Sequence, residues 1–208
     1  MDFDIITESA KKAFDNFVQN IVAYIVGLLI ACIGSMFIIT SAPLFYGLYY
    51  MVLKGTRGEK VEIKDVFYGF SSGNIFIRSW IGFIGIAIAP IVLGVIVFII
   101  IAILTLISPT LAVMLGMLLY LVLLVAIFVL AIFLYYAIYI YIMTPSENIV
   151  YAIKESISIG KANLIMMLLT IIIASVMSCL WVTTPLGMVF AAYVLKELKP
   201  DLKDGSGI

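Results

Sequence analysis

The sequence contains no histidine, only two cysteines, and few charged residues, which make up 12% of its 208 positions. Histidine is the commonest general base and metal ligand, so its absence removes most catalytic and metal-binding chemistry. Two cysteines cannot form a disulfide scaffold, and 12 basic against 12 acidic residues leave no positive surplus for nucleic acid. These absences predict a non-enzymatic protein with no catalytic residues, no cofactor, no metal and no nucleic-acid partner.

Hydrophobic residues, in contrast, make up 65% of the chain. A soluble domain carries about 45–50% apolar and about 25% charged residues, so this composition excludes a water-soluble fold. The chain is therefore predicted to be an all-α, polytopic helical membrane protein.

Three long runs contain no charged residue: 16–53, 79–146 and 162–195. A bilayer core about 30 Å thick needs about 20 apolar residues for each helical crossing, so the middle run has room for two. Ser108 and Pro109 predict the turn between them, because serine caps a helix and proline suits its first turn. The middle run therefore predicts helices over 80–107 and 110–143.

The two outer runs are broken by Pro43 and Pro185. Proline removes a backbone donor and disfavours helical geometry in the residue before it, so one helix is predicted to end there and another to begin. The return arms, 43–54 and 185–196, are only about 18 Å long at 1.5 Å per residue. They are either half-crossings buried against other helices or the ends of helices that begin before the proline.

The distribution of basic residues decides between hairpins and single crossings in the outer runs. If all three runs are hairpins, all 12 Lys and Arg lie on one side of the membrane, as the positive-inside rule prefers. Single crossings would divide them between the two sides. The sequence thus predicts six membrane segments as three hairpins, in a multi-pass cell-membrane protein whose N- and C-termini are cytoplasmic.

Amphipathic segments precede the hairpins, and the whole chain is predicted to be one membrane domain, 1–208. Thr144 is predicted to cap the second amphipathic helix, with Pro145 in its first turn and Glu147 completing a capping box. The predicted parts are an interfacial helix (1–17), a first hairpin (18–54), a cytoplasmic loop with an interfacial segment (55–79), a second hairpin (80–143), a second interfacial helix (144–161), a third hairpin (162–196) and a cytoplasmic tail (197–208).

An internal repeat is indicated at an offset of 142 positions. Pro43-Leu44 aligns with Pro185-Leu186, and Val52-Leu53-Lys54 aligns with Val194-Leu195-Lys196. The spacing from proline to lysine is the same in both copies. The repeated unit is therefore predicted to be an interfacial helix followed by a membrane hairpin.

Four short motifs carry a resemblance to known families: Lys12-Ala13-Phe14 leading to Asn20, Pro43-Leu44-Phe45-Tyr46-Gly47, Asp65-Val66-Phe67-Tyr68-Gly69-Phe70, and Ala152-Ile153-Lys154-Glu155-Ser156 with Lys161-Ala162-Asn163. Together they resemble prokaryotic integral-membrane families of unknown function, including YciC-like proteins and the membrane domain attached to some glycerophosphodiester phosphodiesterases. The resemblance implies a helical membrane domain and, in the phosphodiesterase case, an anchor for a separate catalytic domain. It carries over no catalytic residue.

Four residues are candidate lipid or interface anchors: Arg78, Trp80, Lys154 and Lys161. An arginine at the foot of a long helix can extend to a lipid phosphate while a neighbouring indole lies among the headgroups. The anchoring is either generic or a specific lipid site. Membrane lipids are thus the predicted partners, and glycine and small residues spaced four apart, such as Gly27 and Ala31, leave a homo-oligomer or a membrane-protein partner open.

Tyrosines and cysteines complete the predicted features. The tyrosines at 135, 136, 139 and 141 predict an aromatic belt at the cytoplasmic interface, with a ligand groove as the alternative. Cys32 and Cys179 lie in apolar runs, which predicts buried, inert thiols.

Two functions follow from these features. The first is a structural or accessory membrane protein that interacts with lipid or a partner through its amphipathic helices. The alternative is a permease or a transporter of lipid or a small solute, in which broken segments line a cavity. The candidate helix-break and cavity residues are Pro43, Gly47, Pro185 and Gly187.

Overall fold

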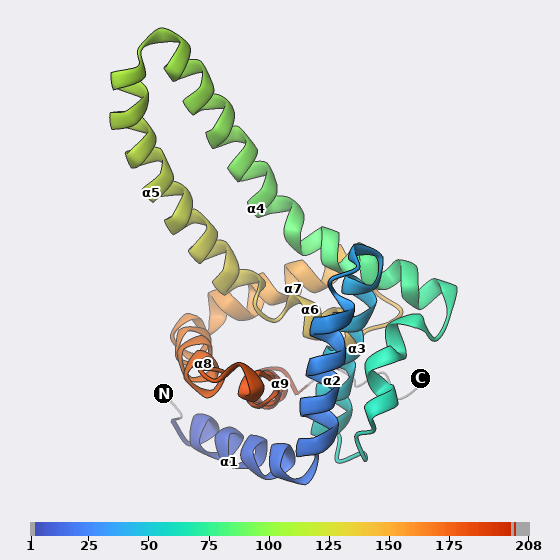
Figure 1. Cartoon of the computed structure of the whole chain (residues 1–208). Helices are drawn as coiled ribbons and strands as arrows, with labels where there is room; N and C mark the ends of the chain where they lie inside the picture. The colour runs from blue at the N-terminus through green and yellow to red at the C-terminus, as the bar shows by residue number, and fades with distance from the viewer. Residues whose placement is uncertain (1–2, 201, 203–208) are drawn as a thin grey trace.

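The computed structural model describes residues 3–200 and 202, and within them every regular element is helical (Figure 1). Much of the predicted tail, 201 and 203–208, lies outside the described residues. The elements are α1 (Phe3–Gln19), α2 (Ile21–Gly34), α3 (Ile38–Thr56), the 3₁₀ helix η1 (Ile63–Phe70), α4 (Gly73–Ile107), α5 (Pro109–Leu134), α6 (Ala137–Met143), α7 (Ile149–Ala162), α8 (Leu164–Met177), the 3₁₀ helix η2 (Trp181–Thr183) and α9 (Thr184–Leu198).

The second predicted hairpin is present as α4 and α5, which project far beyond the other helices (Figure 1). Its turn forms as predicted: Ser108 Oγ accepts a hydrogen bond from the Leu111 amide at 3.4 Å, and Pro109 occupies the first turn of α5. Two stretches, Gly73–Ile107 and Pro109–Met143, are long and apolar enough to cross a membrane. The protein is therefore an all-helical chain with two candidate membrane spans.

Two further pairs of consecutive helices are long and apolar enough to cross a membrane only if the two helices of each pair are counted together, and each pair is bent. α1 meets α2 at 83°, and α7 meets α8 at 104°, so counting each pair as one span raises the number of candidate spans to four. The amphipathic segments thus form helices, as predicted, and each turns sharply into an apolar helix. In α1–α2–α3 a bent pair of helices is followed by a return helix, and the same order recurs in α7–α8–α9.

The predicted break at Pro43 is wrong. Pro43 lies inside α3, and the chain turns earlier, at residues 35–37. Side-chain hydroxyls support the new start: Thr40 Oγ1 donates to the Phe37 carbonyl at 2.9 Å and Ser41 Oγ to the Ile38 carbonyl at 2.7 Å. With 19 residues α3 is about 28 Å long, so this return arm is a helix that begins before its proline.

Pro185, in contrast, lies in the first turn of α9, as predicted. A proline is tolerated there because the amides of the first turn have no intrahelical acceptor. The helix has 15 residues and is about 22 Å long. This return arm is therefore a short helix that begins at its proline, as in the alternative of a half-crossing drawn from the sequence.

The predicted start of the second amphipathic helix is also wrong. α7 begins at Ile149, and Asn148 is its cap, because Asn148 Oδ1 accepts from the Tyr151 amide at 2.9 Å. Thr144 instead ends α6, where its hydroxyl donates to the Ile140 carbonyl at 2.7 Å. α6 itself arises from an unpredicted break at Tyr135 and Tyr136, between α5 and α6.

α1 packs lengthwise on α9. Ala13 and Phe17 of α1 are buried, Lys12 bonds Glu197 at 3.2 Å, and Asn16 bonds Tyr193 at 3.4 Å. The residue numbers rise in α1 as they fall in α9, so the two helices are antiparallel. Because α1 bends by 83° from α2, the α8–α9 hairpin runs across the direction of α2 rather than along it (Figure 1).

Two glycines allow η1 to lie directly on α3. A Cβ atom at Gly47 of α3 would overlap the Val66 carbonyl oxygen, and one at Gly69 of η1 would overlap the backbone of Pro43. Without side chains at these positions, the two backbones approach closely. The Pro-Leu-Phe-Tyr-Gly and Val-Phe-Tyr-Gly-Phe motifs thus pack against each other in the fold.

Replacing Gly47 or Gly69 by alanine should destabilise the protein by about 1–3 kcal/mol, because rigid backbone lies where the new methyl group would go. The expected result is a lower midpoint of thermal unfolding in detergent. Gly94→Ala is the control, since nothing lies within 4 Å of a Cβ there. Equal midpoints for Gly69→Ala and Gly94→Ala would contradict the close contact of η1 with α3.

Candidate functional site

The main candidate site is an apolar cavity of about 490 Å³ where the α4–α5 hairpin leaves the remaining helices. Its walls come from α3, from the first half of α4, from the second half of α5, and from Tyr135 and Ile138 beyond α5. Representative lining residues are Phe45, Tyr49, Phe83, Ile86, Leu130 and Leu134. None of the described residues that line it is charged.

Polar groups at the cavity are few, and Ser79 is already hydrogen-bonded. Ser79 Oγ donates to the Phe76 carbonyl at 2.6 Å, so the serine makes a bond within its own helix. Tyr49 packs edge-on against Tyr139, with ring centroids 4.9 Å apart. The cavity therefore presents mainly hydrocarbon surface and aromatic faces to an occupant, and no carboxyl, amine or thiol group among the residues described.

The tyrosine run does not form the predicted belt. Tyr136, Tyr139 and Tyr141 are buried in the protein core, and Tyr135 lines the cavity. Nearly every residue of α6 is buried, because the surrounding helices enclose it on all sides, so its tyrosines lie in the core. The position of Tyr135 agrees with the alternative drawn from the sequence, in which the tyrosines line a groove.

Arg78 joins the base of α4 to the end of α6. Its guanidinium donates to three backbone carbonyls: Tyr141 at 2.6 Å, Thr144 at 2.8 Å and Glu147 at 2.9 Å. The guanidinium carbon also lies 3.9 Å from the centroid of the Tyr141 ring. A cation at a helix C-terminus satisfies carbonyls that have no partner within the helix. Arg78 thus holds α4 against α6, and its role toward a lipid phosphate stays a prediction.

The other predicted anchors, Trp80, Lys154 and Lys161, take no part in the hydrogen bonds of Arg78. Trp80 packs against Phe83 at 6.1 Å between ring centroids, one turn along α4. Lys154 and Lys161 are exposed on α7. The structure therefore groups Arg78 and Trp80 at the foot of the hairpin and leaves the two lysines on the surface of another helix.

The predicted helix-break residues are all buried, and none of them lines the cavity. Gly47 and Pro43 lie in the contact with η1. A Cβ at Gly187 would lie against the Ala174 carbonyl and Ser178 Oγ, so Gly187 lets α9 approach α8. These residues serve helix packing in the structure.

The two cysteines differ from each other. Cys32 is half-buried, whereas Cys179 is exposed in the turn between α8 and α9, so the prediction of two buried thiols is wrong for Cys179. The turn at 178–180 exposes it, since a residue at the tip of a hairpin has few neighbours.

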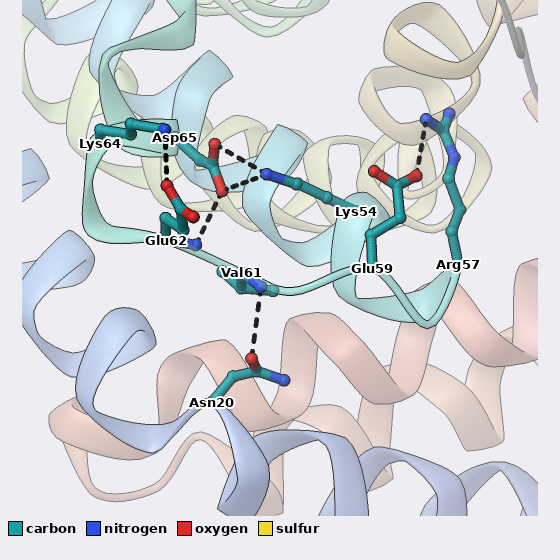
Figure 2. Close-up of polar contacts among 8 residues, drawn as sticks. All are labelled: Asn20, Lys54, Arg57, Glu59, Val61, Glu62, Lys64 and Asp65. Atoms are coloured by element: carbon teal, nitrogen blue, oxygen red, sulfur yellow. Dashed lines mark hydrogen bonds and ion pairs between the residues drawn. The ribbon is translucent and has the colours of Figure 1, made fainter.

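Ion pairs lie at the start of η1 and in the loop before it (Figure 2). Lys54 Nζ lies 2.9 Å from Asp65 Oδ2, and these side chains are only 17% and 9% exposed. Asp65 also accepts from the Glu62 amide at 2.8 Å, which completes a capping box at the start of η1. A hydrogen bond from Lys64 lowers the pKa of the Glu62 carboxyl. The Lys54–Asp65 pair thus connects the end of α3 with the beginning of η1.

A buried polar network around Asn16 was not predicted. Asn16 Nδ2 donates to the Gly55 carbonyl at 2.6 Å, and Asn16 Oδ1 accepts from Tyr24 at 2.8 Å. Asn20, at the bend between α1 and α2, donates to the Asn16 carbonyl at 3.0 Å and accepts from the Val61 amide at 3.4 Å. The only sequence signal was an uncharged polar residue on the apolar side of an amphipathic helix.

Arg78→Lys should lower the thermal midpoint, and Arg78→Ala should lower it further, because a single ammonium cannot reproduce the planar fork that reaches three carbonyls. Lys60→Ala, an exposed lysine in the loop before η1, is the control. If Arg78→Lys unfolds at the wild-type temperature, the carbonyl contacts do not hold α4 to α6.

Asp65→Ala should destabilise the protein by about 3–5 kcal/mol, because it leaves the Lys54 ammonium partly buried without its partner. The double variant Lys54→Met, Asp65→Ala removes both charges and should recover part of this loss. Chemical unfolding in detergent measures both values. A double variant no more stable than Asp65→Ala would contradict the pairing.

Comparison of the chain with protein-family models, with curated proteins and with solved structures yields no match. The resemblance to YciC-like proteins and to the phosphodiesterase membrane domain therefore stays a prediction from the four motifs.

Proposed function

We propose that this chain is a non-enzymatic integral membrane protein with a structural or accessory role, anchored by the α4–α5 hairpin and engaging membrane lipid. The observation that carries the proposal is the hairpin itself. It is free of charge from residue 79 to residue 146, and the most apolar window of α4 has no residue buried inside the protein. So large an exposed apolar surface is characteristic of contact with lipid.

The other two hairpins contact the same membrane without crossing it completely. α2 and α8 each have 14 residues, about 21 Å, which is short of a bilayer core of about 30 Å. Their tips are apolar and exposed, with Phe37 72% and Trp181 53% exposed. These lengths support our proposal of six membrane segments in three hairpins, of which α4–α5 spans and the others enter partway or lie along the interface.

The orientation follows from the basic residues. A spanning hairpin begins and ends on the same side, so the helices before α4 and after α5 share one face of the membrane. That face carries all 12 Lys and Arg, which places it and both termini in the cytoplasm by the positive-inside rule. Exposed Phe14 and Val18 on α1 then lie where lipid or a protein partner reaches them.

The alternative, a permease, has less support. It requires Pro43 and Pro185 to face a solute pathway, and both are buried away from the lining of the 490 Å³ cavity. The long, uncharged and exposed hairpin favours the structural or accessory role over a permease.

Single-cysteine labelling tests the orientation. In a background with Cys32→Ala and Cys179→Ala, a membrane-impermeant maleimide should label Thr110→Cys in intact cells and Lys60→Cys only after permeabilisation. Thr110 lies beside the turn of the hairpin, and Lys60 lies in the exposed loop before η1. Labelling of both from one side would contradict a spanning α4–α5 hairpin.

A further inference from the structure

The cavity at the foot of the α4–α5 hairpin has a definite position relative to the proposed membrane. Its lining on α4 extends from Ser79, the first residue of the charge-free run, to Pro90. At 1.5 Å per residue this reaches about 17 Å along the helix. The cavity therefore begins at the cytoplasmic edge of the hydrocarbon and extends into it.

Small residues create the space. Ala42, Ala87 and Ala131 lie in the walls contributed by α3, α4 and α5, where larger side chains would fill the volume. Pro90 contributes a ring and no backbone donor, so the Ile86 carbonyl lacks its usual helical partner at the same wall. The hollow is thus built into three helices.

We propose that this cavity holds one acyl chain of a membrane lipid. The inference rests on the proposed function, because it requires the hairpin to lie in the bilayer. About 490 Å³ falls within the range of small-ligand sites, which are about 300–1,000 Å³. Alkyl chains are the molecules that surround the hairpin at this depth.

The lining selects a hydrocarbon chain over a polar solute. A polar solute would lose its hydrogen bonds to water and find few replacements, because the walls are almost entirely apolar and Ser79 is already bonded to the Phe76 carbonyl. An acyl chain has no hydrogen bonds to lose on leaving the bilayer core, and it exchanges contacts with other chains for contacts with Phe45, Phe83 and Leu130. The two terminal nitrogens of Arg78, next to Ser79, donate to three backbone carbonyls, so the proposal concerns the acyl chain and not the headgroup.

Photocrosslinking in vesicles tests the proposal. The full chain is reconstituted with phosphatidylcholine that carries a diazirine in one acyl chain, and crosslinked residues are mapped by mass spectrometry. Crosslinks should concentrate on Ile86 and Leu130, which line the cavity and are only partly exposed. Filling the cavity with Ala87→Phe and Ala131→Phe should reduce them severalfold, while crosslinks to exposed Ile99 and Ile103 of α4 stay unchanged.

Ala102→Phe is the matched control, because Ala102 is an exposed alanine farther along α4. It should leave the cavity crosslinks unchanged. If the double variant does not fold, Ala87→Leu alone should still produce a measurable loss in a protein with a wild-type thermal midpoint.

Three results would overturn the proposal. The first is crosslinking at Ile86 and Leu130 that is no stronger than at exposed Ile99, or that is unchanged when the cavity is filled. The second is crosslinking of the cavity walls to a second copy of the chain in place of lipid. The third is no crosslink anywhere on α4 and α5, which would also overturn the proposed function, whereas the first two leave it standing.

Discussion

The arrangement of this protein depends on the contact of η1 with α3, in which two backbones touch because Gly47 and Gly69 have no side chains. This contact brings Asp65 to Lys54 at the end of α3 and buries the pair. α4 begins three residues after η1 ends, so the contact also sets where the α4–α5 hairpin leaves the body. The wall of the cavity on α3 is positioned by the same packing, and a methyl group at either glycine would disturb all of these together.

Polar side chains are scarce here, and several of them bond to backbone groups at the ends of helices. Asn16 and Lys196 donate to the Gly55 and Thr56 carbonyls at the end of α3, and Arg78 donates to carbonyls at the end of α6. The last carbonyls of a helix have no partner within it, and hydrocarbon cannot supply one. Lys199 pairs with Glu155 of α7, so the last residues of α9 contact α3, α1 and α7. A net charge of zero is consistent with this use of charges in local pairs.

Local signals predicted what depends on neighbouring residues alone. Ser108 and Pro109 make their turn, and Pro185 opens α9, because capping and proline geometry act within one turn of helix. The same signals failed at Pro43, which α3 incorporates, and at Thr144, where the next helix begins only at Ile149 because Asn148 provides the cap. Asn16 was missed because its partners, Gly55 and Tyr193, are far away in the sequence.

The sequence by itself determined the helical class, the long apolar hairpin and the concentration of charge outside three runs, because composition and periodicity are properties of the chain. Only the tertiary structure decided that the tyrosines after α5 point inward, that the α8–α9 hairpin crosses the direction of α2, and that three helices leave a cavity at the foot of the hairpin. These features depend on how closely distant segments approach each other. In an apolar chain nearly every helix face can be buried, so hydrophobicity alone does not specify which faces meet, and glycines, alanines and a few hydrogen bonds make that choice.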